Sequence, residues 1–348
     1  MNISKLFVLS LAFIFLNNVY AQKEEEEKAF GEQDWTSARP DGHAPIHVMG
    51  DHYHAKGELM FSYRFMPMFM EGNMRGDDAI DDQEVYEDYM VAPQEMQMNM
   101  HMLGIMYGVS DRITLMAMTN YISNSMDLTA MNGTDFTTEN ANLGDVSLTA
   151  MIKVLNENRQ SFHANLGVSI PTGSVDERDD TPMMNDVVLG YPMQTGSGTF
   201  DPFAKITYLK QFEVFSLGAQ AHFRTRIGEN DENYTFGDSF QASTWVAHKI
   251  SDNFSFSLSA DYTSTEAIDG VNNNLIDMTN TMPLFDVGNT GRESILTGLG
   301  VNYYIANGSL KDLRIGIEYQ LPVWQDVNGI QMEQTQVISG GIQYTLSL

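Results

Sequence analysis

The sequence predicts an all-β protein: an antiparallel transmembrane outer-membrane β-barrel of about 12 strands, with short periplasmic turns and longer extracellular loops. Three observations support this fold class. Apolar and polar residues alternate with a period of two along most of the chain. The connections between the alternating segments are short and long in turn. The amino terminus has the pattern of a secretory signal peptide.

The first element is the signal peptide, which we assign to residues 1–21. Lys5 is followed by the apolar run 6–16, and the small residue Ala21 marks the expected cleavage point. The apolar run is too short to span a bilayer as a helix. These features predict that the mature chain is exported to the cell envelope or beyond it, and the barrel pattern described below places it in the outer membrane of a Gram-negative bacterium.

The next element, residues 22–55, is a periplasmic His-rich segment and a candidate plug, and residues 56–348 form the barrel. Within the barrel the alternation is clear at 253–262, where Phe254, Phe256 and Leu258 alternate with serines. The strand segments lie near 56–70, 93–109, 111–127, 141–155, 158–171, 199–210, 212–227, 234–250, 253–267, 291–306, 310–323 and 332–348. Their length argues against a secreted β-sandwich, whose strands typically have about 5–6 residues.

The connections indicate which end of the barrel faces outward. Tight turns fall at 108–111, 156–158, 209–211, 251–253 and 306–309, and longer connections at 71–92, 128–140, 172–198, 228–233, 268–290 and 324–331. Short turns at one end and long loops at the other are typical of outer-membrane barrels. Closure of the sheet removes the unpaired edges that hydrocarbon does not tolerate.

Composition excludes several function classes. The 348 residues include 19 Lys and Arg against 46 Asp and Glu, a formal net charge of −27, so nucleic acid is not an expected partner. The absence of cysteine excludes a disulfide framework, a thiolate metal site, a cysteine nucleophile and a lipoprotein anchor. Much of the acidic charge falls in the long loops, where it either attracts cations to the mouth or serves solubility and ion binding at the surface.

Two sequence blocks resemble a known family. They are Ala44 to His54, APIHVMGDHYH, and Tyr191 to Pro202, YPMQTGSGTFDP. Both are similar to bacterial outer-membrane "transporter" proteins related to the meta-pathway phenol-degradation porins, some of which are mislabelled alpha-amylase. The resemblance covers nearly all of the mature chain. It implies a barrel that passes small molecules across the outer membrane, and it carries no catalytic motif.

Histidines are concentrated before the first strand. His43, His47, His52 and His54 occur in twelve residues together with Met49, and imidazole is a common ligand of copper and zinc. These five residues form a hypothetical metal site. The spacing matches no standard zinc motif, and the alternative is a plug or latch in which the histidines hydrogen-bond to the barrel wall.

Methionines alternate along the first three strands. The residues predicted to line the lumen are Met60, Arg64, Met66 and Met68 in the first strand and Met116, Met118 and Asn120 in the third. The face of the methionine row from Met96 to Met106 in the second strand stays open. A thioether-lined lumen favours Cu(I) or Ag(I), or an apolar solute; the alternative is a packed or lipid-facing row.

The function predicted from these elements is a porin- or transporter-like channel that passes or binds a small solute. The alternative is a copper- or silver-handling barrel, with Cu(I) or Cu(II) as its metal. An enzyme is not expected, because the chain has no Gly-x-Ser-x-Gly elbow and no carboxylate pair that spacing identifies. The expected partners are outer-membrane lipid and a small-molecule or metal-ion solute, with the oligomeric state open.

Overall fold

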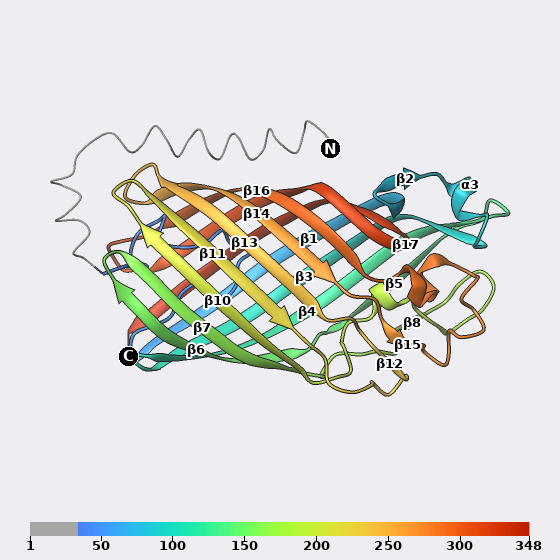
Figure 1. The fold of residues 1–348 in the computed structure, drawn as a ribbon, viewed down its shortest axis with the longest axis horizontal. Coiled ribbons are helices and arrows are strands. Elements are labelled where there is room, and N and C mark those ends of the chain that lie inside the picture. Colours follow the sequence, from blue (N-terminus) through green and yellow to red (C-terminus); the bar gives the residue numbers. More distant parts are fainter. Residues whose placement is uncertain (1–33, 348) are drawn as a thin grey trace.

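The computed structural model describes residues 34–347, which form a closed antiparallel barrel (Figure 1). The predicted signal peptide and cleavage site lie outside the described residues. The wall strands are β1 (Glu58–Gly76), β3 (Val91–Ser110), β4 (Ile113–Ala130), β6 (Val146–Glu157), β7 (Gln160–Ile170), β10 (Asp201–Gln211), β11 (Phe215–Arg224), β13 (Ser239–Lys249), β14 (Phe254–Thr265), β16 (Arg292–Tyr304) and β17 (Leu313–Ser347). The short turns and the carboxyl terminus lie at one end, and the long loops lie at the other.

Strand β17 closes the barrel and contributes two antiparallel strands to its wall. Its first half pairs with β16, from Arg314 to Val327, and its second half pairs with β1, from Ile330 to Ser347. The Tyr319 hydroxyl donates to Gln336 Oε1 at 3.0 Å and joins the two halves. Because β17 counts as two crossings, the wall has the number of strands that the sequence predicts.

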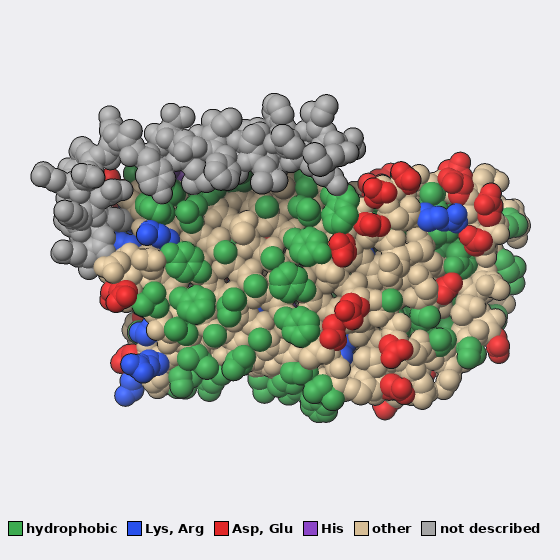
Figure 2. Space-filling view, viewed as in Figure 1, with side chains coloured by type: hydrophobic (Ala, Val, Ile, Leu, Met, Phe, Trp, Pro, Cys, Tyr) green, Lys and Arg blue, Asp and Glu red, His purple; other side chains and the backbone are tan. Residues whose placement is uncertain are grey.

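The outer face of the wall is an apolar band, as expected for contact with lipid. Exposed side chains such as Leu103, Leu299 and Ile317 alternate with buried lumen-facing ones. In Figure 2 hydrophobic side chains cover the middle of the barrel, and Asp and Glu gather around the loop end. The predicted separation of apolar wall and acidic rim is therefore present in the structure.

The long loops contain further structure that strand patterning did not predict. Strand β5 (Asp135–Leu143) extends β4 outward as a hairpin, with Thr129 opposite Asp135. The remaining elements are β2 (Asp78–Ile80), α3 (Asp82–Val85), β8 (Arg178–Asp179), β9 (Val187–Val188), η1 (Tyr191–Met193), β12 (Tyr234–Thr235), β15 (Asp269–Gly270), η2 (Pro283–Phe285) and η3 (Val287–Asn289). No helix among the described residues is both long and apolar enough to span a membrane.

Candidate functional site

Residues 34–54, here called the plug, pass through the turn end of the lumen. Trp35, Ala44 and Val48 of the plug pack against Leu209 and Trp245 of the wall. Wall side chains also donate to plug carbonyl oxygens: Ser255 to Pro40 (2.7 Å), Arg64 to Ile46 (2.9 Å), Gln220 to Met49 (3.2 Å), Arg314 to Ala44 and Ser216 to Asp41. These bonds satisfy the polar backbone of a segment that has no regular secondary structure.

Gly50 allows the plug to lie against the wall. Its backbone has φ +68°, a conformation that favours glycine. A Cβ at this position would lie 2.7 Å from Asn165 Nδ2. The Gly50 carbonyl accepts hydrogen bonds from His163 Nε2 at 2.9 Å and Asn165 Nδ2 at 3.0 Å.

His47 links the plug to two carboxylates of the wall. Its Nδ1 lies 2.5 Å from Glu318 Oε2 in β17, and its Nε2 lies 2.9 Å from Asp261 Oδ1 in β14. Burial alone would lower the pKa of His47, but the charges of Asp261 and Glu318 outweigh burial and raise it to about 10. His47 is therefore a cation at neutral pH, and it is held as a latch between the two strands.

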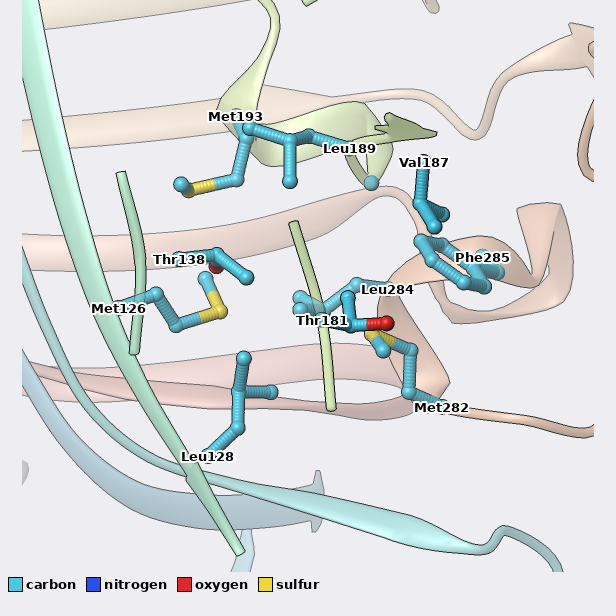
Figure 3. A pocket seen from close by; sticks show the side chains of 11 residues that line it. Met126, Leu128, Thr138, Thr181, Val187, Leu189, Met193, Met282, Leu284 and Phe285 are labelled. Carbon is cyan, nitrogen blue, oxygen red and sulfur yellow. The ribbon is translucent and has the colours of Figure 1, made fainter. Parts of the chain in front are cut away.

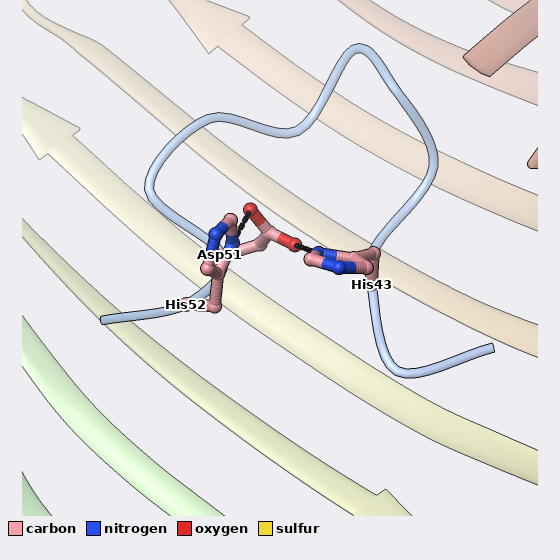
Figure 4. A group of neighbouring side chains, drawn as sticks. All are labelled: His43, Asp51 and His52. Carbon is pink, nitrogen blue, oxygen red and sulfur yellow. Dashed lines mark hydrogen bonds and ion pairs between the residues drawn. The ribbon is translucent and has the colours of Figure 1, made fainter. Parts of the chain in front are cut away.

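Three other plug residues form a compact group (Figure 4): the ligand atoms of His43, Asp51 and His52 all lie within 4.8 Å of one another. His52 Nδ1 lies 2.8 Å from Asp51 Oδ1, and His43 Nδ1 lies 3.7 Å from Asp51 Oδ2. Burial, assisted by the charge of Arg314, lowers the pKa of His43 to about 3. Burial would raise the pKa of Asp51, but His52 and His43 hold it well below its usual range.

The structure thus divides the five residues of the hypothetical metal site. His43 and His52 come together, and the His54 ring lies 5.1 Å from the His52 ring. His47 is engaged elsewhere, and the Met49 carbonyl accepts from Gln220. Asp51 belongs to the compact group although the predicted ligand set omitted it; its position beside His52 in the sequence is the only signal that could have included it.

The methionines of the first strands face the lumen. Met60, Met106, Met116 and Met151 form a buried cluster, with Met118 packed against it. Met66 and Met68, on the lumen-facing row of β1, are partly exposed. Arg64 is buried beneath the plug, and Asn120 donates to Met100 Sδ at 3.6 Å.

The face of β3, which the sequence leaves open, is resolved. Met96, Met102 and Met106 are buried, whereas Leu103 and Ile105 are exposed. The polar odd-numbered residues of β3 can face outward because their side chains form hydrogen bonds. Gln97 donates to Asn99 at 2.9 Å, and His101 shares a 2.8 Å hydrogen bond with Tyr63 of β1. The methionine row of β3 therefore joins the lumen.

Two long loops pack against the wall at the opposite end. Figure 3 shows apolar side chains of Val187, Leu189, Met282, Leu284 and Phe285 converging on one pocket. The same buried cluster includes Met126, Leu128 and Met332 of the wall. We call this cluster, together with the two loops, the cap. Tyr191 and Tyr234 pack edge to face at 5.0 Å, and burial raises the pKa of both phenols.

Between plug and cap, several lumen-facing side chains remain partly exposed. They are Met66, Met68, Met98, Met100 and Met118 on one side, and Lys205, His222 and Arg224 on the other. The plug thus packs inside one end of the lumen, the loop cluster packs at the other, and the side chains between them are partly exposed. These features define the class: a transmembrane β-barrel of the outer membrane with the architecture of a channel.

The chain belongs to the family described as "Putative MetA-pathway of phenol degradation", which it matches over residues 88–333. The family confirms the resemblance inferred from the sequence and a Gram-negative outer-membrane location. No curated protein matches the chain.

Among solved structures, the chain is similar to the COG4313 outer membrane channel from Pseudomonas putida F1, with 13% identity and TM-score 0.59 over 86% of this chain and 99% of that one. More distant is the transport unit of the Escherichia coli autotransporter AIDA-I, with 11% identity and TM-score 0.46 over 86% of this chain and 93% of that one. The similarity to the Pseudomonas putida structure thus confirms the fold of an outer-membrane barrel. The comparisons do not support the copper-handling alternative.

Proposed function

We propose that the protein is a gated channel for small, predominantly apolar solutes, and that the plug and the cap hold it closed in the state described here. The observation that carries the proposal is the set of partly exposed methionines between the two closures. Thioether side chains are flexible and polarizable, and they pack against apolar molecules of varied shape.

The closures support gating rather than a permanently open pore. The plug carries charged and polar contacts with several wall strands, whereas the cap is an apolar cluster of loop residues. A solute therefore has to pass an apolar gate, a methionine-lined middle and a polar gate in sequence. Movement of the plug is the step that completes passage to the periplasm.

The test is uptake of the apolar dye N-phenylnaphthylamine by porin-deficient Gram-negative cells, whose outer membrane excludes it. Expression of the protein is expected to raise the uptake rate. The variant Met100→Gln/Met118→Gln keeps the side-chain size but adds amides, whose desolvation is expected to slow uptake about threefold or more. Met131→Gln, at a loop position that is 57% exposed, is the matched control. Uptake unaffected by expression, or equally affected by both sets of substitutions, would refute the proposal.

A further inference from the structure

Two cations lie together in the lumen, on strands β10 and β11 across the ring from β1. Lys205 Nζ and Arg224 Cζ each lie 5.8 Å from the centroid of the Phe203 ring. The His222 ring meets the same phenyl ring edge to face at 5.6 Å. The buried Phe203 ring therefore lies beside two cations and an imidazole.

Neither cation has an ion-pair partner among the described residues, although Arg224 lies near enough to Asp201 for their charges to interact. Within residues 34–347, Lys205 and Arg224 have no hydrogen bond and no carboxylate within ion-pair distance, and Arg224 Nε and His222 Nε2 are buried without partners. Arg64 of β1 adds a third positive charge that acts on Lys205. By contrast, the nearby Arg226 faces Asp201 at 3.7 Å.

Unpaired cations in a partly enclosed site carry a desolvation cost and repel one another. Such a cost is more typical of a ligand-binding site than of a structural one. The chain has 46 acidic residues and a net charge of −27. None of the acidic residues that the structure describes forms an ion pair with Lys205 or Arg224. The missing counter-charge is therefore expected from a ligand.

The position of the phenyl ring is itself built into the wall. A Cβ on Gly167 of β7 would lie 2.3 Å from Phe203 Cζ, so only glycine leaves room for the ring at this point. The Phe203 ring thereby packs closely against the wall beside the two cations. On the β1 side, Arg64 is followed on the same lumen-facing row by Met66 and Met68.

We propose that Lys205 and Arg224, beside Phe203, form an anion-binding subsite, and that the preferred solute is an amphipathic organic anion such as an aromatic carboxylate. The carboxylate would bind the ammonium and guanidinium groups, and the apolar part of the solute would lie on the partly exposed methionines of the lumen. This inference rests on the proposed channel function and narrows its solute class.

The test is direct binding to the full mature chain in zwitterionic lipid nanodiscs at pH 7.5, followed by fluorine NMR. The probes are 4-fluorobenzoate and its neutral isostere 4-fluorobenzamide, with empty nanodiscs subtracted. The carboxylate is expected to bind about tenfold or more tightly than the amide, as for charge-assisted hydrogen bonds. Lys205→Gln/Arg224→Gln is expected to abolish the difference. Lys210→Gln, a lysine on the same strand at the turn end, should preserve it.

Heat-modifiable migration in gels confirms that each variant folds, and Arg224→Lys provides a charge-conserving variant expected to retain most of the preference. Equal affinities for the two probes, absence of carboxylate binding, or a preference that survives Lys205→Gln/Arg224→Gln would overturn the subsite. Displacement of 4-fluorobenzoate by inorganic phosphate at equal concentration would also overturn it, because the apolar part would then contribute nothing. Dye uptake tests the channel separately, so either proposal can fail alone.

Discussion

At the scale of single residues, His47 is the contact that best explains why the plug stays in place. It is buried between Asp261 and Glu318, two carboxylates on strands distant in sequence. The Ser259 hydroxyl donates to Glu318 Oε1 at 2.7 Å, and Gln320 Nε2 donates to Asp261 Oδ2 at 3.0 Å, so both acids are oriented by the wall. Removing the imidazolium would leave two buried like charges facing each other.

His47→Gln is therefore expected to lower the free energy of plug opening by about 3 kcal/mol at pH 6, since an uncompensated buried charge is costly. Hydrogen exchange of peptides covering 40–54 measures that free energy. His248→Gln, at an exposed position on β13, is the control. Unchanged exchange in His47→Gln would show that the latch contributes nothing.

The same residue predicts a pH dependence. The pKa of His47 is raised from 6.5 to about 10 in the closed state, so its stabilisation is complete below pH 6.5 and is lost as the pH rises toward 10. From pH 6.5 to pH 8, the difference in free energy of plug opening between wild type and His47→Gln should shrink by about 1.6 kcal/mol in all. A constant difference would contradict a protonated latch.

Residue patterns predicted the lumen-facing side of β1 and β4 but not that of β3. In the first two cases an aromatic or aliphatic row clearly marks the lipid side. In β3 the outward residues Gln97, Asn99 and His101 are polar, and their hydrogen bonds, which a sequence does not display, make the outward position tolerable. The grouping of His43 with His52 and the separation of His47 likewise depend on how the plug folds.

At the scale of elements, the plug and the cap are held in place by different kinds of contact. The plug has no repeating hydrogen bonds of its own and depends on the wall, whereas the cap is an apolar cluster of loops. Strand periodicity predicts the wall because apolar and polar residues alternate along each strand. It cannot predict the cap, because Val187–Leu189 and Met282–Phe285 meet only after the barrel has brought their loops together.

The cysteine-free chain allows the plug to be locked in place. A Cβ on Gly316 would lie 3.0 Å from Ile46 Cβ, close enough for a disulfide after a small adjustment. Oxidised Ile46→Cys/Gly316→Cys is expected to lose dye uptake, and reduction should restore it. The single variant Ile46→Cys controls for the substitution. Equal uptake in the oxidised and reduced states, with the disulfide verified by mass spectrometry, would mean that passage does not require this part of the plug to move.

At the scale of the whole molecule, charge and polarity are arranged by depth. The loop end is acidic, the outer wall is apolar, and the lumen holds cations without carboxylate partners among the described residues. Composition alone predicted the acidic rim but concealed the lumenal cations, since 19 basic residues are few against 46 acidic ones. An anion that crosses the rim would meet a favourable potential only inside the barrel.

The most direct test of the account is the conductance of single proteins in planar bilayers, with and without residues 34–54. The full chain should be closed for most of the recording, and the chain lacking the plug should show frequent or sustained openings of larger conductance. Folding of both forms is checked by heat-modifiable migration. Indistinguishable conductance in the two folded proteins would contradict the claim that the plug closes the channel.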